Sequence, residues 1–208
     1  MEAGTAAAAP PGVAVSAALG DRLPGSRREA DAVGVLGVAL ATAGASFLKI
    51  GLAGAAGFPW TRRALVELRR RIAEAGGDAA LVAVAFADDE APAAIRPPDL
   101  PWVAAEAGLE GAMLDTLGKG PSIVDLMGEP ALRAWVQAVQ GAGLLCGLAG
   151  SLTLDHLARA AALRPDVVGV RGAVSEGGRT GRLSEELVRR AARAVAGAHA
   201  RRPAPACG

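Results

Sequence analysis

The stretch SFLKIGLAGAAGFPWTRRALVELRRRIAEAGGDAALVAVAFAD, residues 46–88, decides the fold that the sequence predicts. Two apolar runs of strand length, residues 46–50 and 80–86, flank a segment in which Leu65 and Leu68 recur at helical spacing. Each run is apolar throughout instead of alternating, which is typical of parallel strands covered on both faces. The stretch therefore predicts a strand, a helix and a second, parallel strand.

The same alternation continues on both sides of this unit. Further strand-length runs, separated by helical segments, lie at residues 13–17, 111–114, 144–148 and 167–170. Such a series predicts an α/β fold with a parallel sheet and right-handed crossovers. A TIM-type (β/α)8 barrel needs eight strands and about 250 residues, so the six strands here would form an incomplete barrel. A flavodoxin-like open sheet is the alternative, and the chemistry at the strand ends has to decide between them.

Composition excludes several classes of protein. The chain has 208 residues and 22 basic against 21 acidic side chains, mixed along its length, so nucleic acid and anionic membrane surfaces are not expected partners. No secretory signal is evident at the start, and the uncharged run 32–48 reads as a buried helix followed by a strand. We expect a cytoplasmic protein with a disordered leader at 1–12, one domain at 13–200 and a disordered tail at 201–208.

Metal and disulfide chemistry are not expected either. The two cysteines, Cys146 in an apolar run and Cys207 near the end, do not form a disulfide framework. His156 and His199 both lie on predicted helices and are more typical of surface groups than of ligands. No cluster of His, Cys and carboxylate side chains suggests a metal site, and no cofactor is expected.

Reactive groups in parallel α/β folds gather at the C-terminal ends of strands. In this apolar chain those positions are unusually polar. The candidate site residues there are Asp21, Lys49, Asp88, Asp115, Lys119, Gly150, Ser151, Arg171 and Gly172.

Lysine is scarce, because all but two of the 22 basic residues are arginine. Lys49 lies between Leu48 and Ile50, and such flanks would lower the pKa of its ammonium toward that of a usable amine nucleophile or base; pairing with an aspartate is the alternative. Lys119 lies in a glycine-bearing loop and could reach a substrate carbonyl or phosphate, or be a solvated loop lysine. Asp115 could orient a lysine or act as general acid/base, or merely cap a loop.

The last two predicted strands suggest a phosphate site. If they are strands seven and eight of a barrel, their loops are where such barrels commonly hold a phosphate. Gly150 and Ser151 would offer backbone and hydroxyl donors, Arg171 a charge-assisted fork, and Gly172 a further backbone N–H. The loop GGRTGR, residues 177–182, could close on a second anion or be an ordinary turn.

Taken in order, these pieces resemble one known family, the (5-formylfuran-3-yl)methyl phosphate synthases of methanofuran biosynthesis. The resemblance rests on SAALGD (16–21), FLKIGL (47–52), FAD (86–88), AAEAG (104–108), AMLDTLGK (112–119), LLCGLAGSL (144–152), VGVRGA (168–173) and GGRTGR (177–182). It implies a TIM-barrel lyase that condenses two glyceraldehyde 3-phosphate molecules into 4-(hydroxymethyl)-2-furancarboxaldehyde phosphate by Schiff-base chemistry. It also implies that Lys49 is the proton acceptor and that Asp115 and Lys119 line the same site.

Two departures qualify the resemblance. Family members carry an earlier segment with strands one and two and the Schiff-base lysine, so we expect this chain to hold strands 3 to 8 and to be inactive if that lysine is indispensable. Ser175 stands where the family has a cysteine, and Gly120 and Pro121 follow Lys119 where the family has Asp-Gly.

Two other functions stay open. The same residues could serve a different phosphosugar aldolase or isomerase, with Lys49 forming the imine. A non-catalytic barrel remnant that binds phosphorylated ligands is the second, and unpaired strand edges would then recruit other chains. In each case the expected ligand is a small phosphorylated molecule, and we expect a homo-oligomer.

Overall fold

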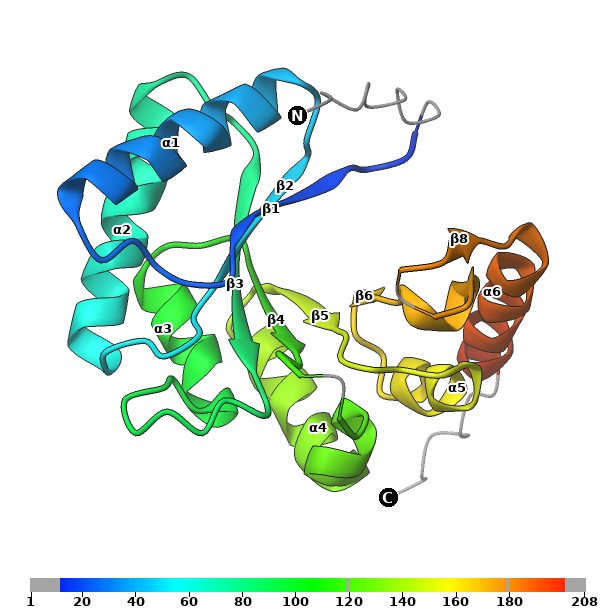
Figure 1. Cartoon of the computed structure of the whole chain (residues 1–208). Helices are drawn as coiled ribbons and strands as arrows, with labels where there is room; N and C mark the ends of the chain where they lie inside the picture. The colour runs from blue at the N-terminus through cyan, green and yellow to red at the C-terminus, as the bar shows by residue number, and fades with distance from the viewer. Residues whose placement is uncertain (1–11, 119, 179, 201–208) are drawn as a thin grey trace.

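The computed structural model describes residues 12–118, 120–178 and 180–200. Lys119, almost all of the predicted leader and the predicted tail 201–208 therefore lie outside the described residues. Within them the chain forms an α/β structure in which a curled parallel sheet is surrounded by helices (Figure 1).

The sheet has six parallel strands whose order in space is their order in the sequence. The strands are β1 (Ser16–Gly20), β2 (Phe47–Gly51), β3 (Ala80–Phe86), β4 (Gly111–Asp115), β5 (Leu145–Leu148) and β6 (Val167–Val168). A flavodoxin-like sheet reverses its strand order at a switch point. Because no reversal occurs among these strands, the sheet is of the barrel type, and the parallel βαβα prediction is confirmed.

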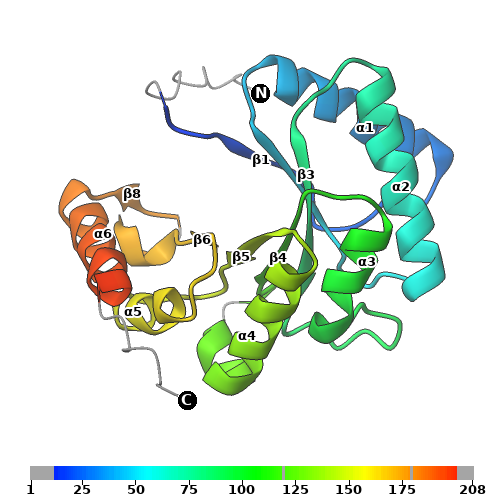
Figure 2. The same ribbon diagram turned by 180° about the vertical axis from the view of Figure 1, so that it is seen from behind.

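Helices cover the convex side of the curled sheet, as both views show (Figures 1 and 2). They are α1 (Arg27–Thr42), α2 (Phe58–Glu74), α3 (Leu100–Glu106), α4 (Ile123–Gly141), α5 (Leu154–Ala162) and α6 (Glu185–Ala200), with short 3-10 turns η1 (Pro97–Asp99) and η2 (Gly172–Val174). A two-residue antiparallel ribbon, β7 (Ser175–Glu176) with β8 (Arg182–Leu183), precedes α6. The GGRTGR loop is thus the connection of this hairpin.

Side-chain caps explain where several helices begin. Thr153 accepts a hydrogen bond from the backbone of His156, and the His156 side chain accepts one from the backbone of Thr153, a reciprocal capping box at the start of α5. Gly128 has a non-helical backbone (φ 75°, ψ 153°), so α4 is two helical segments joined at a kink. Pro130 lies just after Gly128, at the start of the second segment, where a proline is tolerated.

Two apolar cores lie on the two faces of the sheet. The larger one fills the space between strands and helices and includes Leu48 and Ile50, whose side chains are fully buried. The smaller one lies on the concave face and consists of Ala53, Val82, Val84, Phe86, Met113 and Ala149, with Phe47 packed against it. Because side chains alternate along a strand, residues between those of the first core point to the concave face.

Two expectations about apolar segments need correction. The first strand was expected at 13–17 but lies at Ser16–Gly20, where the backbone pairs with β2. Run 32–48 does form a helix and then a strand, yet the helix is only partly buried, since Val35 is 71% exposed. Trp102 of α3 is 63% exposed, and its ring contacts the ring of Phe58. In the described part of the chain, no helix combines the length and apolarity needed to cross a membrane.

Candidate active site

Lys49 and Asp115 project from the same, concave face of the sheet. Lys49 pairs in register with Val82 of β3, and Asp115 pairs with Phe86, and both partners belong to the concave core. The two pairing levels are four residues apart along β3, roughly 13 Å at about 3.3 Å per residue. Asp115 is therefore at the C-terminal edge, while Lys49 lies deeper, half-buried beside Phe47.

Asp88 and Asp89 follow β3 and bond to neighbouring loops on opposite sides. Asp88 Oδ1 accepts the backbone N–H of Leu117 at 2.7 Å, and Asp88 Oδ2 accepts that of Gly118 at 2.7 Å. Asp89 Oδ2 accepts the N–H of Gly54, in the loop after β2, at 2.7 Å. The β3 loop thus joins the loops after β2 and β4.

The loop after β5 is joined to the loop after β4 in turn. Thr116 is buried, and its Oγ1 lies 3.3 Å from Ser151 Oγ. Gly150 has φ 107°, and a Cβ there would come within 2.9 Å of Thr116 Cγ2, so this close contact requires glycine. Ser151 itself has a positive φ of 49°, which leaves its side chain exposed beside Thr116.

The first loop of the site is anchored through its backbone. Ala53 N–H donates to the Asp21 carbonyl at 3.0 Å, and the Asp21 backbone passes directly over Gly51. The Asp21 side chain is exposed. The structure therefore places Asp21 next to the end of β2, the strand that carries Lys49.

Arg171 and Gly172 lie after β6, at the start of η2, and both are exposed. The Arg171 carbonyl accepts the Ser175 hydroxyl at 2.9 Å, which ties this loop to β7. Ser175, the residue that replaces the family's cysteine, is buried in this contact. Lys119, the remaining catalytic candidate, follows Gly118 in sequence and lies outside the described residues.

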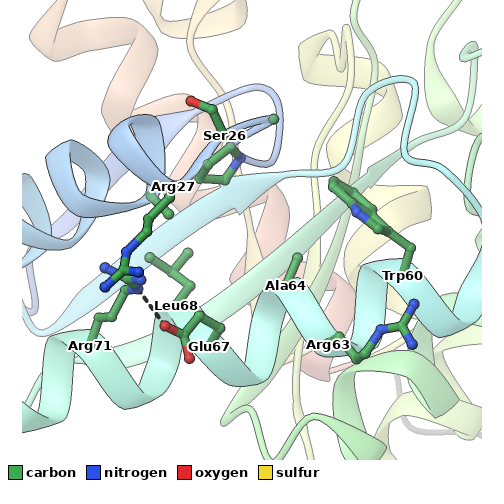
Figure 3. A pocket seen from close by; sticks show the side chains of 11 residues that line it. Ser26, Arg27, Trp60, Arg63, Ala64, Glu67, Leu68 and Arg71 are labelled. Carbon is green, nitrogen blue, oxygen red and sulfur yellow. Dashed lines mark hydrogen bonds and ion pairs between the residues drawn. The ribbon is translucent and has the colours of Figure 1, made fainter.

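A pocket among the described residues lies elsewhere. It has a volume of about 370 Å³ and lies between α1 and α2 on the convex side (Figure 3). Arginines and one tryptophan dominate its walls, and the Glu67 carboxylate accepts a hydrogen bond from Arg71 at 2.7 Å within it. We place the candidate site at the strand ends instead, because the predicted reactive groups converge there and none of them lines this pocket.

Two residues outside the expected chemistry, Cys146 and His156, have structural roles. Cys146 on β5 is fully buried, and its burial, with the nearby Asp166 carboxylate, raises the pKa of the thiol to about 12. His156 caps α5 and its Nε2 lies 3.4 Å from Asp125. In the described ranges, no group of three or more His, Cys, Asp or Glu side chains is arranged to hold a metal ion.

Sequence reasoning missed three residues that build this edge, Gly51, Thr116 and Gly118, which donate, accept or make room for the contacts described above. It noted Asp89 only as one of the acidic residues that follow β3. The repeated acidic residues after β3 were the one available signal. The partners of those carboxylates are backbone groups from distant loops, and backbone groups carry no sequence signature.

The curled parallel sheet, its outer helices and the polar strand ends define an α/β protein of the TIM-barrel type. The crystal structure of 3-hexulose-6-phosphate synthase from Salmonella typhimurium superposes with a TM-score of 0.55 at 17% identity, covering 86% of this chain and 72% of that one. A crystal structure of mandelate oxidase gives a TM-score of 0.54 at 17% identity, over 83% of this chain and 57% of that one. At these identities the likeness concerns the fold.

Sequence comparison narrows the class to one family. The model of the 4-HFC-P synthase family matches residues 3–192, and the chain belongs to this family. The (5-formylfuran-3-yl)methyl phosphate synthase of Methanococcus maripaludis is 33% identical over 190 residues, 89% of this chain and 78% of that protein. The synthase of Methanothermobacter thermautotrophicus is 35% identical over 185 residues, 86% of this chain and 75% of that protein. The resemblance seen in the motifs is thereby confirmed, and the chain is a member of an enzyme family.

Proposed function

We propose that the protein is a lyase that condenses two molecules of glyceraldehyde 3-phosphate to 4-(hydroxymethyl)-2-furancarboxaldehyde phosphate, a step in methanofuran biosynthesis. Membership of the synthase family supports the product. The observation that carries the chemistry is that Lys49 and Asp115 project from one face of the sheet, at and below its C-terminal edge. We further propose a cytoplasmic location.

The atoms of this reaction balance without an oxidant or reductant. Two triose phosphates yield one furan aldehyde phosphate, one inorganic phosphate and two waters. The protein therefore has to supply proton transfer, carbonyl activation and anion binding. Amines and carboxylates perform the first two, and backbone N–H groups, hydroxyls and guanidinium groups perform the third.

Lys49 is assigned the role of proton acceptor. It lies half-buried on the concave face beside the apolar side chains of Phe47 and Val82. Asp115 is assigned to orient the reacting groups or exchange protons at the edge. Lys119, four residues later, is assigned to a substrate carbonyl or phosphate.

The phosphate sites are assigned to the last two loops of the sheet. Gly150 and Ser151 follow β5, and Arg171 and Gly172 follow β6, so the two loops belong to neighbouring strands. We propose that β5 and β6 correspond to strands seven and eight of a TIM barrel, so that β1 to β6 would be strands three to eight. Asp21, at the other side of the edge, is assigned to a substrate hydroxyl because a carboxylate repels phosphate.

Product formation tests the proposal directly. The purified chain is incubated with glyceraldehyde 3-phosphate, and the furan aldehyde phosphate is detected by its ultraviolet absorbance and its mass, with phosphate release measured in parallel. We expect one phosphate per furan product. Phosphate release without a furan would contradict the proposal.

A second function, an aldolase or isomerase acting on one phosphosugar, is favoured by one observation: Lys49 is half-buried on the concave face and could itself form an imine. Borohydride reduction with glyceraldehyde 3-phosphate, followed by peptide mapping, separates the two. An adduct on Lys49 supports the second function and contradicts the proton-acceptor role. Binding of the triose phosphate with neither adduct nor product would indicate a non-catalytic phosphate-binding protein.

The edge strands support a proposal about assembly. Among the described residues β1 and β6 each pair with one neighbour, and Val167 of β6 is 45% exposed. Such edges readily pair with further strands. We therefore propose a homo-oligomer, which light scattering during size-exclusion chromatography would show; a monomer at all concentrations would contradict this.

A further inference from the structure

The loop after β3 lies between the loops that follow β2 and β4, the strands that carry Lys49 and Asp115. On one side is the loop after β2, the strand that carries Lys49. On the other is the loop after β4, which contains Lys119. Both contacts of the β3 loop to these neighbours are made by adjacent carboxylates, Asp88 and Asp89.

Asp88 is fully engaged with the β4 loop. Its two oxygens each accept a backbone N–H at 2.7 Å, one from Leu117 and one from Gly118. Hydrogen bonds from N–H groups to a carboxylate are shorter and stronger than neutral ones, and two such bonds on one carboxylate fix the loop in both position and rotation. A Cβ at position 118 would come within 3.1 Å of Asp88 Oδ2, so glycine permits the approach.

Asp89 makes the corresponding contact on the other side. Its Oδ2 accepts the N–H of Gly54 at 2.7 Å, and its Oδ1 accepts the N–H of Ala91 at 3.1 Å, which rigidifies its own loop. Gly54 has φ 63°, a backbone conformation that turns its N–H toward the β3 loop at little cost for glycine. The Thr116–Ser151 contact extends the same chain of bonds to the loop after β5.

We propose that Asp88 and Asp89 are positioning residues, which hold the loops after β2 and β4 at a set distance so that Lys49 of β2 and Asp115 of β4 act on one substrate. This gives Asp88 a role in loop position beside the substrate binding expected of it, because each of its oxygens already accepts one backbone N–H group. The inference about turnover rests on the proposed function. The inference about loop positions rests on the hydrogen bonds alone.

Amide hydrogen exchange, followed residue by residue, tests the loop positions in the full chain. Replacing Asp88 by Ala removes both acceptors, and we expect exchange at Leu117 and Gly118 to accelerate at least about tenfold, with Gly54 little changed. Asp89→Ala should show the reverse pattern, with acceleration at Gly54. Asp88→Asn keeps one acceptor oxygen, so one of the two amides should remain protected.

Glu90→Gln is the matched control, since Glu90 is an exposed acidic residue in the same loop. It should alter neither set of amides. Unchanged exchange at Leu117 and Gly118 in Asp88→Ala, in protein whose melting remains cooperative, would overturn the proposal.

Kinetics with glyceraldehyde 3-phosphate separate positioning from substrate contact. If Asp88 is a positioning residue, Asp88→Ala should lower kcat about tenfold or more with a smaller change in KM, and amide exchange at Leu117 and Gly118 should be faster. A raised KM with unchanged amide exchange would show that Asp88 contacts the substrate. Faster amide exchange with an unchanged kcat would show that the position of the loop does not affect turnover. If the unmodified chain forms no product, the proposed function fails, while the exchange result still decides whether the two carboxylates hold the loops.

Discussion

The backbone of Asp21 passes so close to Gly51 that a Cβ at position 51 would come within 2.4 Å of the Asp21 carbonyl oxygen. This contact joins the end of β1 to the end of β2, and the neighbouring bond from Ala53 N–H to the same carbonyl holds it. The first loop of the candidate site therefore depends on the absence of a side chain at residue 51.

Gly51→Ala should accordingly destabilise the protein. Both atoms in conflict belong to the backbone or to Cβ, so neither can rotate away, and overpacking of this kind costs about 1–3 kcal/mol of the free energy of unfolding. Urea unfolding followed by circular dichroism measures the change.

The control for this prediction is Gly141→Ala. Gly141 is the exposed last residue of α4 and has open space at its Cβ position, so the change should be neutral or slightly stabilising. Equal stability of Gly51→Ala and the unmodified protein would show that the Asp21 loop moves freely.

Lys49→Met and Lys49→Arg should both abolish most product formation. Methionine cannot accept a proton, and the guanidinium of arginine stays protonated at neutral pH, so each should lower kcat about 100-fold or more while the fold is retained. Arg133→Gln, an exposed change on the convex-side helix α4, should leave kcat unaltered. Activity retained in Lys49→Arg would mean that positive charge, and not proton acceptance, is what position 49 supplies.

Cys146 should resist alkylation in the folded protein. Because burial raises the pKa of its thiol to about 12, the reactive thiolate is scarce and access is blocked. A Cys207→Ser background isolates this residue, and iodoacetamide labelling followed by mass spectrometry reports it. Fast labelling without urea would contradict the buried position.

The same shift in the pKa of Cys146 makes the free energy of unfolding depend on pH in the alkaline range. The pKa of the Cys146 thiol is higher in the folded than in the unfolded protein, so folding favours the protonated thiol. Its contribution to the free energy of unfolding is complete below the ordinary thiol pKa of about 9. This contribution is lost as the pH rises from there toward 12. Cys146→Ala should flatten this part of the stability profile, measured by urea unfolding at a series of pH values.

Asp125 should stabilise the folded protein with the opposite pH dependence, since its contribution should be lost at acid pH. The Ser122 hydroxyl donates to its carboxylate at 2.7 Å and holds the pKa of Asp125 below its usual value of 3.8; His156 and Arg159 act in the same sense. A depressed folded-state pKa gives stability that is present above pH 3.8 and lost as the pH falls through the folded-state value.

Asp125→Asn should thus lower the midpoint of urea unfolding at neutral pH and make the acid limb of the profile less steep. Glu106→Gln, at the exposed end of α3, is the control and should leave that limb unchanged. An identical acid limb in Asp125→Asn would show that the Ser122 bond does not persist in solution.

Much of the layered fold could be predicted from local pattern. The runs 46–50 and 80–86 became β2 and β3 within one residue, and Thr153 is the N-cap of α5. Burial on both faces of a strand and capping of a helix both act within a few residues, so they leave a local signature. The first strand was placed three residues early, because apolar Val13 and Val15 resemble a strand while the pairing with β2 begins at Ser16.

The candidate site divides in the same way. The sequence by itself determined that a βαβα chain would place polar groups at one edge of a parallel sheet, and it singled out Lys49 and Asp115 by scarcity and position. Only the tertiary structure decided that Asp88 and Asp89 bond to opposite loops, that Thr116 meets Ser151, and that Gly51 makes room for Asp21. These contacts join residues far apart in the chain through strand order and register, and their partners are largely backbone atoms, which every residue carries.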